Sequence, residues 1–131
     1  MAKSTTTVSE EGMVSTSRIR DWDVSIDPTG ESAPDTLELL LADYAACAVP
    51  AFRVGAKQRG VDDLGHLEID ASGELNEDDK LASVSLDVRV ETELEAEQSN
   101  EIIERVEALC KVHDALKPEL HAAISLEGGA F

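Results

Sequence analysis

The most regular pattern in the sequence lies between residues 82 and 91, where apolar and polar residues alternate without interruption. An apolar side chain at every second position is typical of a β-strand with one buried and one solvent-facing side. A shorter alternation of the same kind covers residues 66–71, and the polar residues 76–79 between the two segments favour a turn. We therefore expect a β-hairpin here, with an apolar face that the rest of the chain must cover.

Two segments that flank this hairpin carry apolar residues at the three- and four-residue spacing of an amphipathic helix. The first helix is expected from residue 36 to about residue 60, with a kink or a weakened turn at Pro50. The second is expected from about residue 99 to residue 116, because Pro118 prevents its continuation.

Further strands are expected at both ends of the chain. A β-branched run at residues 5–9 and an alternation through residues 22–26 indicate strands before the first helix, and a last strand is expected over residues 120–126. The resulting order is β-β-α-β-β-α-β. It predicts a single α+β domain over residues 1–131, with two helices covering one face of an antiparallel sheet and with residues 1–4 flexible.

The formal net charge is −17, from 28 Asp and Glu against 11 Lys and Arg. Such an acidic surface repels phosphate groups, so nucleic acids and anionic membranes are disfavoured as partners. The acids are spread along the chain among apolar positions rather than gathered in a tail. We interpret this charge as an adaptation to a high-salt cytoplasm, where salt screens the self-repulsion of the surface.

The N-terminal residues contain no apolar run typical of a signal peptide. No stretch approaches the ~20 apolar residues of a membrane span, so we expect a cytoplasmic protein. The chain has two cysteines, Cys47 and Cys110. In the cytoplasm such a pair favours a redox, metal-binding or inert role over a structural disulfide.

Helical spacing places both cysteines on the apolar faces of the two expected helices. Rigid helices that pack together could hold two thiols as a redox pair. The alternative is that both thiols are inert, since a free cysteine is among the most buried residue types and often acts as a small hydrophobic side chain. Reactivity requires a lowered thiol pKa, which periodicity does not reveal.

His113 follows Cys110 by three residues, a spacing found in one half of many zinc sites. A complete zinc site would need further ligands from His66, His121 or Cys47, and these form no second closely spaced pair. We therefore favour another role for His113, either as a cap at the end of the second helix or as a neighbour that tunes the pKa of Cys110.

Two segments resemble the motifs of the OsmC/Ohr family. Residues 36–47 read Thr-Leu-Glu-Leu-Leu-Leu-Ala-Asp-Tyr-Ala-Ala-Cys and are similar to that family's helix motif, Pro-x-Glu-Leu-Leu-Leu-Ala-x-x-Ala-x-Cys. Residues 110–116 read Cys-Lys-Val-His-Asp-Ala-Leu and are similar to its second motif, Cys-Pro-Val-His/Ser-x-x-Leu. The two motifs occur in the family's order, and the resemblance extends over roughly residues 14–127.

The resemblance implies an OsmC-like α+β fold that forms an intertwined homodimer with active sites at the subunit interface. By similarity, Cys47 corresponds to the peroxidatic cysteine and Cys110 to the resolving cysteine of an enzyme that reduces organic hydroperoxides in oxidative-stress defence. Such a peroxidase needs no bound cofactor or metal and is reset by an external dithiol. The alternative within the same fold is a non-catalytic protein that binds a small ligand or senses redox state.

Some positions differ from the family motifs. The residue ten before Cys47 is Leu37, where the best-characterised branch of the family has a glutamate, whereas Glu38 matches a broader branch and is a candidate to tune the thiol pKa or line its pocket. Lys111 stands where the second motif has proline. Its charge could stabilise a thiolate at Cys110, or the side chain could simply be solvated.

The family also uses an N-terminal arginine to lower the pKa of its reactive thiol. Arg20 and then Arg18 are the candidates in this chain, because both share strand parity with Trp22 and would then point inward. The alternative for both is an ordinary surface cation. Tyr44, one helical turn before Cys47, could line the same pocket or serve only in packing.

Overall fold

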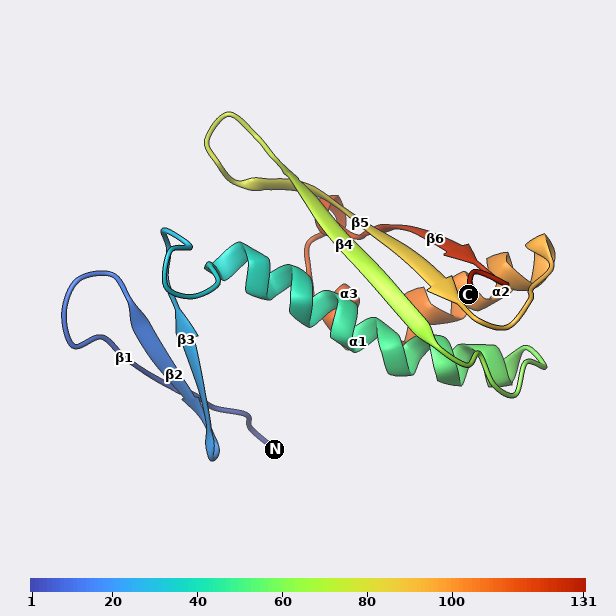
Figure 1. Ribbon diagram of the computed structural model, residues 1–131, viewed down its shortest axis with the longest axis horizontal. Helices are drawn as coiled ribbons and strands as arrows, with labels where there is room; N and C mark the ends of the chain where they lie inside the picture. Colours follow the sequence, from blue (N-terminus) through green and yellow to red (C-terminus); the bar gives the residue numbers. More distant parts are fainter. The chain divides into compact units, whose positions relative to one another are not determined.

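The computed structural model describes residues 1–131 without gaps. Its elements occur in the order β1, β2, β3, α1, β4, β5, α2, α3, η1 and β6 (Figure 1). They divide into two compact units, residues 1–40 and residues 41–131, and the six strands form two sheets of three strands each. The α+β class predicted from the sequence is confirmed.

The first unit contains a small antiparallel sheet. Its strands β1 (Thr6–Val8), β2 (Ser15–Ile19) and β3 (Trp22–Ile26) pair in that order, each antiparallel to the next. The predicted order had two strands before the first helix, one fewer than the structure contains. The extra strand is β2, whose polar sequence Ser-Thr-Ser-Arg-Ile has no alternation that would reveal it.

Asp27 organises the loop that follows β3. Its buried carboxylate accepts hydrogen bonds from the backbone N–H and the hydroxyl of both Thr29 and Ser32, at 2.8 to 3.0 Å. These four bonds, led by the one from the Thr29 backbone, hold the pKa of the carboxyl well below its usual range. The loop leads into α1, which spans Thr36–Gln58 and continues through Pro50.

The second unit is built on a mixed sheet with strand order β4–β5–β6. The elements that follow α1 are β4 (Leu67–Leu75), β5 (Leu81–Val90), α2 (Ala96–Leu109), α3 (Lys111–Ala115), η1 (Pro118–Leu120) and β6 (Ala123–Glu127). The expected hairpin is formed by β4 and β5, but β6 runs parallel to β5, so this sheet is not wholly antiparallel as predicted. The parallel pairing follows from the long connection through α2, which returns the chain to the end of the sheet where β5 began.

A β-bulge near the hairpin loop explains where β5 departs from its expected alternation. Leu75 pairs with Leu81 whereas Glu74 pairs with Ser83, which leaves Ala82 as an extra residue. Ala82 was expected to face the core and is exposed instead, because the bulge changes which positions face inward. Beyond the bulge, the buried side chains of β5 are Val84, Leu86, Val88 and Val90.

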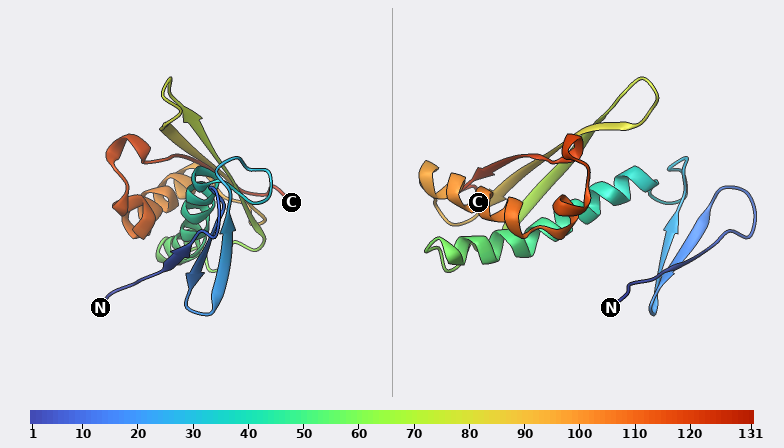
Figure 2. Two further views of the ribbon diagram at one scale, coloured as in Figure 1. Left: turned by 90° about the vertical axis from the view of Figure 1, so that its left-hand side faces the viewer. Right: turned by 180° about the vertical axis from the view of Figure 1, so that it is seen from behind.

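The helices α1 and α2 lie on the same face of the β4–β5–β6 sheet (Figure 1; Figure 2). The core contains the inward side chains of β5 and one buried face of each helix. The fully buried large side chains of the helices are Tyr44, Phe52, Ile102 and Val106. This arrangement brings the C-terminal end of α2, and with it Cys110, next to the middle of α1.

The two helices pack closely at Gly55. A Cβ atom at this position would lie 3.1 Å from Cβ of Arg105 in α2, so a larger side chain would push the helices apart. Arg105 also donates a hydrogen bond from Nε to the Gln58 side-chain oxygen at 2.6 Å. This close crossing fixes the separation of the elements that carry the cysteines.

By length and composition alone, α1 is apolar enough to cross a membrane, which corrects the expectation that no stretch of the chain approaches a membrane span. The criterion is weak for a single helix, because the core helix of a soluble protein also meets it. Here Tyr44, Ala48, Ala51 and Phe52 of α1 are buried within the fold.

Candidate active site

Cys47 lies in the middle of α1 and is half-buried. It lines an open pocket of about 290 Å³. The other residues of the pocket wall are Pro50, Ala51, Val54, Leu109 and Lys111. All but Lys111 present apolar side chains, so the Cys47 sulfur is reached from solvent through an apolar depression.

Cys110 lies at a break between two helices, which corrects the prediction of one continuous helix over residues 99–116. It is both the C-cap residue of α2 and the N-cap residue of α3, with extended backbone angles φ −74° and ψ 115°. Its N–H still donates to the Val106 carbonyl at 2.9 Å, while its own carbonyl accepts from the Asp114 N–H at 3.1 Å. The sequence has neither glycine nor proline at the break, so no common signal of a helix end marks it.

The two thiols are neighbours and are not joined in a disulfide. Burial raises the pKa of Cys47, but hydrogen bonding from the Val112 backbone, the Cys110 thiol and the Lys111 backbone outweighs this effect. The positive charge of Lys111 acts in the same direction. As a result, the pKa of Cys47 lies below the ordinary thiol value, which is the condition for a reactive cysteine.

Cys110 has the opposite character. Burial is the largest influence and raises the pKa of this thiol, which is only 2% exposed. Its interactions with Cys47 raise the pKa further, and backbone hydrogen bonding from His113 and Val112 only partly offsets the increase. Cys110 is therefore protonated under conditions in which Cys47 forms a thiolate.

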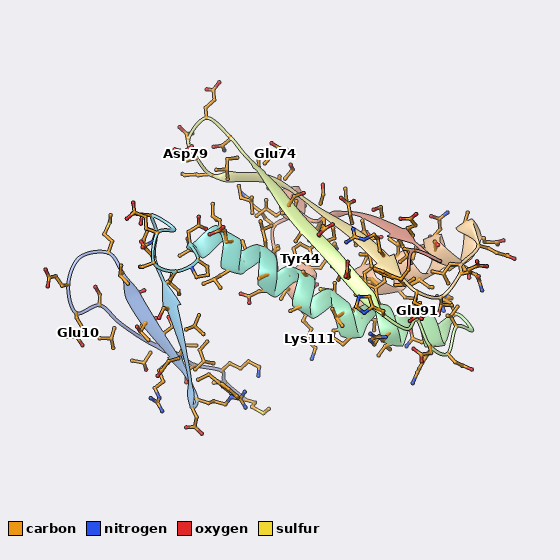
Figure 3. The ribbon with its side chains drawn as sticks, in the orientation of Figure 1. Glu10, Tyr44, Glu74, Asp79, Glu91 and Lys111 are labelled. Atoms are coloured by element: carbon orange, nitrogen blue, oxygen red, sulfur yellow. The ribbon has the colours of Figure 1, made fainter.

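Lys111 acts on a different thiol from the one expected. The sequence suggested that its charge would stabilise Cys110, its neighbour in the chain, whereas in the structure its backbone and charge lower the pKa of Cys47. The difference arises because the extended Cys110 backbone turns α3 so that its first N–H groups face α1. Figure 3 shows the Lys111 side chain extending past α1, and Lys111 lines the same pocket as Cys47.

Tyr44 and His113 form a buried hydrogen bond behind the two thiols. The Tyr44 hydroxyl lies 2.6 Å from Nδ1 of His113, and both side chains are buried. His113 therefore does not cap α2 with its side chain, as one expectation had it, and it acts on Cys110 through its backbone N–H rather than its ring. No group of three or more His, Cys, Asp or Glu side chains is placed to hold a metal ion.

The remaining predicted site residues lie in the first unit. Arg20 is the first residue of the two-residue turn between β2 and β3, with φ +56°, so the strand parity that linked it to Trp22 is broken by a chain reversal. Arg18 lies on β2 with an exposed side chain, 3.7 Å from the Asp23 carboxylate. Both arginines are exposed in the chain, contrary to the inward orientation expected, and a role for either at the thiol stays a prediction.

Glu38 takes part in a reciprocal cap at the start of α1. Its carboxylate accepts from the Asp35 N–H at 2.9 Å, while the Asp35 carboxylate accepts from the Glu38 N–H at 2.8 Å. This pair of bonds explains an acid at this position in structural terms. Whether Glu38 also influences the thiol stays a prediction.

Sequence reasoning missed the backbone groups of the site. The N–H groups of Val112 and Ala122 belong to residues whose side chains carry no chemistry, and no sequence signal could have identified them. His121 was considered only as a zinc ligand, whereas its ring stacks on His113 at 3.9 Å between centroids.

Fold and site together define an α+β protein with a paired-thiol site between a central helix and the end of the following one. Residues 29–125 match the family described as OsmC-like protein, and the chain belongs to this family. A relative from the halophile Haloferax volcanii, described as an uncharacterized protein, is 46% identical over 127 residues, which cover 97% of this chain and 96% of the relative. Its source agrees with the high-salt interpretation of the acidic composition.

Solved structures share the fold over almost the whole chain. An OsmC-like protein from Mycoplasma pneumoniae has a TM-score of 0.80 and 18% identity, covering 98% of this chain and 96% of that one. The organic hydroperoxide resistance protein OhrB of Bacillus subtilis has a TM-score of 0.71 and 21% identity, covering 95% and 98%. A Legionella pneumophila structure, described as an organic hydroperoxide resistance protein OsmC, has a TM-score of 0.74 and 19% identity, covering 95% and 96%. At these identities the likeness establishes the fold.

Proposed function

We propose that this chain is a cytoplasmic thiol peroxidase that reduces organic hydroperoxides, with Cys47 as the attacking thiolate and Cys110 as the resolving thiol. One observation carries the proposal: two neighbouring unbonded thiols whose pKa values are shifted in opposite directions. The Cys47 sulfur also opens onto a pocket that a peroxide can enter, whereas the Cys110 side chain is buried behind it.

In the first step, the Cys47 thiolate attacks the outer oxygen of the hydroperoxide. A sulfur–oxygen bond forms as the oxygen–oxygen bond breaks, and the alkoxide leaves and takes a proton from solvent. The products are an alcohol and a sulfenic acid on Cys47, so sulfur is oxidised by two electrons and the peroxide is reduced by two.

In the second step, the Cys110 sulfur attacks the sulfenic acid. The thiol proton leaves with the hydroxyl group as water, and a Cys47–Cys110 disulfide results. An external dithiol then reduces this disulfide to restore both thiols, so the cycle needs no bound cofactor or metal. The protonated state of Cys110 suits this order, because a thiol that is not ionised does not compete with Cys47 for the peroxide.

Two further observations support an organic peroxide as substrate. The pocket wall beside Cys47 is apolar except for Lys111, so an alkyl group gains hydrophobic contact that hydrogen peroxide cannot. Proteins with the same fold include some described as organic hydroperoxide resistance proteins, from Bacillus subtilis and Elizabethkingia anophelis. These descriptions favour a role in defence against oxidative stress.

The direct test is to mix the reduced protein with one equivalent of cumene hydroperoxide. We expect both thiols to become unreactive towards a thiol reagent, the intact mass to fall by two hydrogens, and peptide mapping to identify a Cys47–Cys110 crosslink. Dithiothreitol should restore both thiols and sustain repeated turnover. Hydrogen peroxide should react more slowly under the same conditions.

Thiols that stay fully titratable after this treatment would exclude the peroxidase. An apolar molecule that co-purifies with such an unreactive protein would then support the alternative, a non-catalytic ligand-binding protein of the same fold. Formation of the disulfide without turnover in the presence of dithiols would instead support a redox sensor.

We also propose that two copies of the chain form a homodimer, as the family resemblance implies. The first unit exposes several large apolar side chains, a feature often found at protein interfaces. These are Val8, Met13, Val14, Ile19 and Trp22, of which Trp22 is 67% exposed. Light scattering in concentrated salt should give twice the mass of one chain, and a mass of one chain would refute the dimer.

A further inference from the structure

The hydroxyl of Tyr44 joins three segments of the second unit. Tyr44 lies on α1, one turn before Cys47, and only 1% of its surface is exposed. Its oxygen accepts a hydrogen bond from the Ala122 N–H at 2.9 Å, where the chain approaches β6, and lies 2.6 Å from His113 Nδ1 in α3. One side chain thereby ties α1 both to α3 and to the entry of the last strand.

The direction of the Tyr44–His113 bond follows from its surroundings. The Ala122 N–H can only donate, so it uses a lone pair of the hydroxyl and leaves the hydroxyl hydrogen free. A buried hydroxyl hydrogen needs an acceptor, and Nδ1 of His113 is the acceptor in reach. His113 is therefore assigned as the neutral tautomer with its proton on Nε2. Burial lowers the pKa of His113 and raises that of Tyr44, in agreement with two neutral partners.

His121 holds the His113 ring from its other side. The two rings are stacked, with centroids 3.9 Å apart and planes inclined by 24°. The His121 ring is fixed in turn by donating from Nε2 to the Leu116 carbonyl at 3.0 Å. His113 is thus clamped between α1 and the segment that precedes β6.

The clamped residue lies directly after the groups that face Cys47. The helix α3 has only five residues, and it begins at Lys111. The N–H groups of Lys111 and Val112 point towards the Cys47 sulfur, and Lys111 lines the same pocket as Cys47. Because His113 is the next residue, any shift of its ring is transmitted over one or two peptide units to those N–H groups.

We propose that Tyr44 and His113 are a positioning pair, whose hydrogen bond holds the backbone of residues 110–112 against Cys47. The pair acts on Cys47 through the backbone that it fixes. This inference deepens the proposed peroxidase function, since the thiolate that it maintains is the attacking group of that reaction.

The test measures the pKa of Cys47 from the pH dependence of its alkylation by iodoacetamide, with the modified peptide followed by mass spectrometry and no peroxide present. Tyr44→Phe removes the donor, and His113→Leu removes the acceptor. Each should raise the Cys47 pKa by about one unit and slow its alkylation near neutral pH about tenfold, because the thiolate is the reactive form. His113→Asn keeps an oxygen acceptor near the position of Nδ1 and should retain most of the wild-type rate.

His66→Asn is the matched control, because His66 is exposed and pairs with Glu68 on the surface of the sheet. It should leave the Cys47 pKa unchanged. Circular dichroism checks the fold of each variant. If Tyr44→Phe does not fold, the proposal is tested by comparing the Cys47 pKa of His113→Asn with that of His113→Leu. If His113→Leu also fails to fold, NMR of the wild-type chain decides, since the proposal requires His113 to be neutral with its proton on Nε2.

The proposal is overturned if folded Tyr44→Phe or His113→Leu keeps the wild-type Cys47 pKa, or if His113 carries its proton on Nδ1 near neutral pH. Absence of peroxide turnover in the wild-type chain would refute the peroxidase function. It would not affect the comparison of Cys47 pKa values, because alkylation needs no peroxide. Conversely, a wild-type enzyme that turns over peroxide while all three variants match it in Cys47 pKa would refute only the positioning pair.

Discussion

Cys47 and Cys110 occupy one site, yet their thiols differ in the direction of their pKa shifts. Burial acts to raise the pKa of both. At Cys47 the hydrogen bonds from the Val112 backbone, the Cys110 thiol and the Lys111 backbone, with the charge of Lys111, outweigh burial. At Cys110 backbone hydrogen bonding does not outweigh burial. The difference in pKa therefore comes from the hydrogen bonds that the α3 backbone and the Cys110 thiol direct at Cys47, and not from the residue type or from burial alone.

The same comparison holds for access. Cys47 lines a pocket that opens to solvent, whereas Cys110 is 2% exposed and lies against the core. The thiol with the lower pKa is also the one that an incoming molecule can reach. Ionisation and access thus favour the same order of events in the proposed reaction.

The largest effect on peroxide turnover is expected when either sulfur is removed. Cys47→Ser should abolish peroxide turnover completely, because a serine hydroxyl is not ionised near neutral pH and cannot accept the peroxide oxygen. Cys110→Ser should still consume one equivalent of peroxide and then stop with a sulfenic acid on Cys47. Peroxide consumption, together with trapping of the sulfenic acid by dimedone, measures both outcomes. If neither variant consumes the first equivalent of peroxide, the two thiols are not functionally distinct.

Two substitutions of Lys111 should reduce the pKa difference between Cys47 and Cys110 to different extents. Lys111→Gln removes the charge but keeps the backbone N–H, whereas Lys111→Pro removes both. Proline is tolerated at the first position of a helix, and the extended backbone of Cys110 suits a following proline. We expect the Cys47 pKa to rise by about half a unit in Lys111→Gln and by about one unit in Lys111→Pro.

Concentrated salt separates these two contributions. Screening should reduce the effect of Lys111→Gln, because an exposed charge is screened, and should leave the additional effect of Lys111→Pro unchanged. Lys117→Gln is the matched control, since Lys117 is an exposed lysine outside the pocket wall. A Lys111→Pro variant with the wild-type Cys47 pKa would show that neither the charge nor the N–H of residue 111 matters.

The positions of the two cysteines could be predicted from sequence only in part. The spacing of apolar residues placed Cys47 correctly on a helix that ends near Gly60, because that periodic signal is long and ends at a glycine. It placed Cys110 inside a helix, because local periodicity continues through residue 116. The break at Cys110 is accompanied by contacts distant in sequence that local pattern does not encode, in which Tyr44 accepts from the Ala122 N–H and bonds His113 of α3.

Turns and crossovers account for the other differences between the predicted and the observed structure. The inward orientation predicted for Arg20 assumed that it shares one strand with Trp22. The turn at Arg20 instead separates β2 from β3. The parallel pairing of β6 likewise depends on the path of the crossover, which periodicity cannot reveal. The hairpin of β4 and β5 was predicted well because its alternation is local and its turn is rich in polar residues.

Unfolding measurements test the difference in burial between the two cysteines. Cys110→Ala should lower the free energy of unfolding by about 1 kcal/mol, since it removes a buried sulfur and leaves a small cavity. Cys47→Ala should cost less, because its side chain borders an open pocket and alanine is a good helix former. Urea denaturation of both reduced variants checks the order, and a larger cost at Cys47 would contradict the assigned burial.

The smallest expected effect is a pH dependence through His113. The groups that face its ring are Tyr44 from α1, Glu107 from α2, Asp114 from α3 and His121 before β6. Burial, and then the nearby His121, lower the pKa of folded His113 below its ordinary value of 6.5. The unfolded chain therefore binds a proton first as pH falls, so this contribution to stability is complete above pH 6.5 and is lost as pH falls through the lower folded pKa.

Acidification should also reduce the difference between the thiols, because a protonated His113 has no free Nδ1 to accept from Tyr44. Urea denaturation of wild type and His113→Asn at about pH 7.5 and about pH 5 isolates the contribution, since the many surface carboxylates are common to both proteins. The wild type should lose more stability than His113→Asn over this interval. Equal losses would mean that His113 does not change its proton affinity on folding, and its bond to Tyr44 could then not be the neutral pair that holds α3 against Cys47.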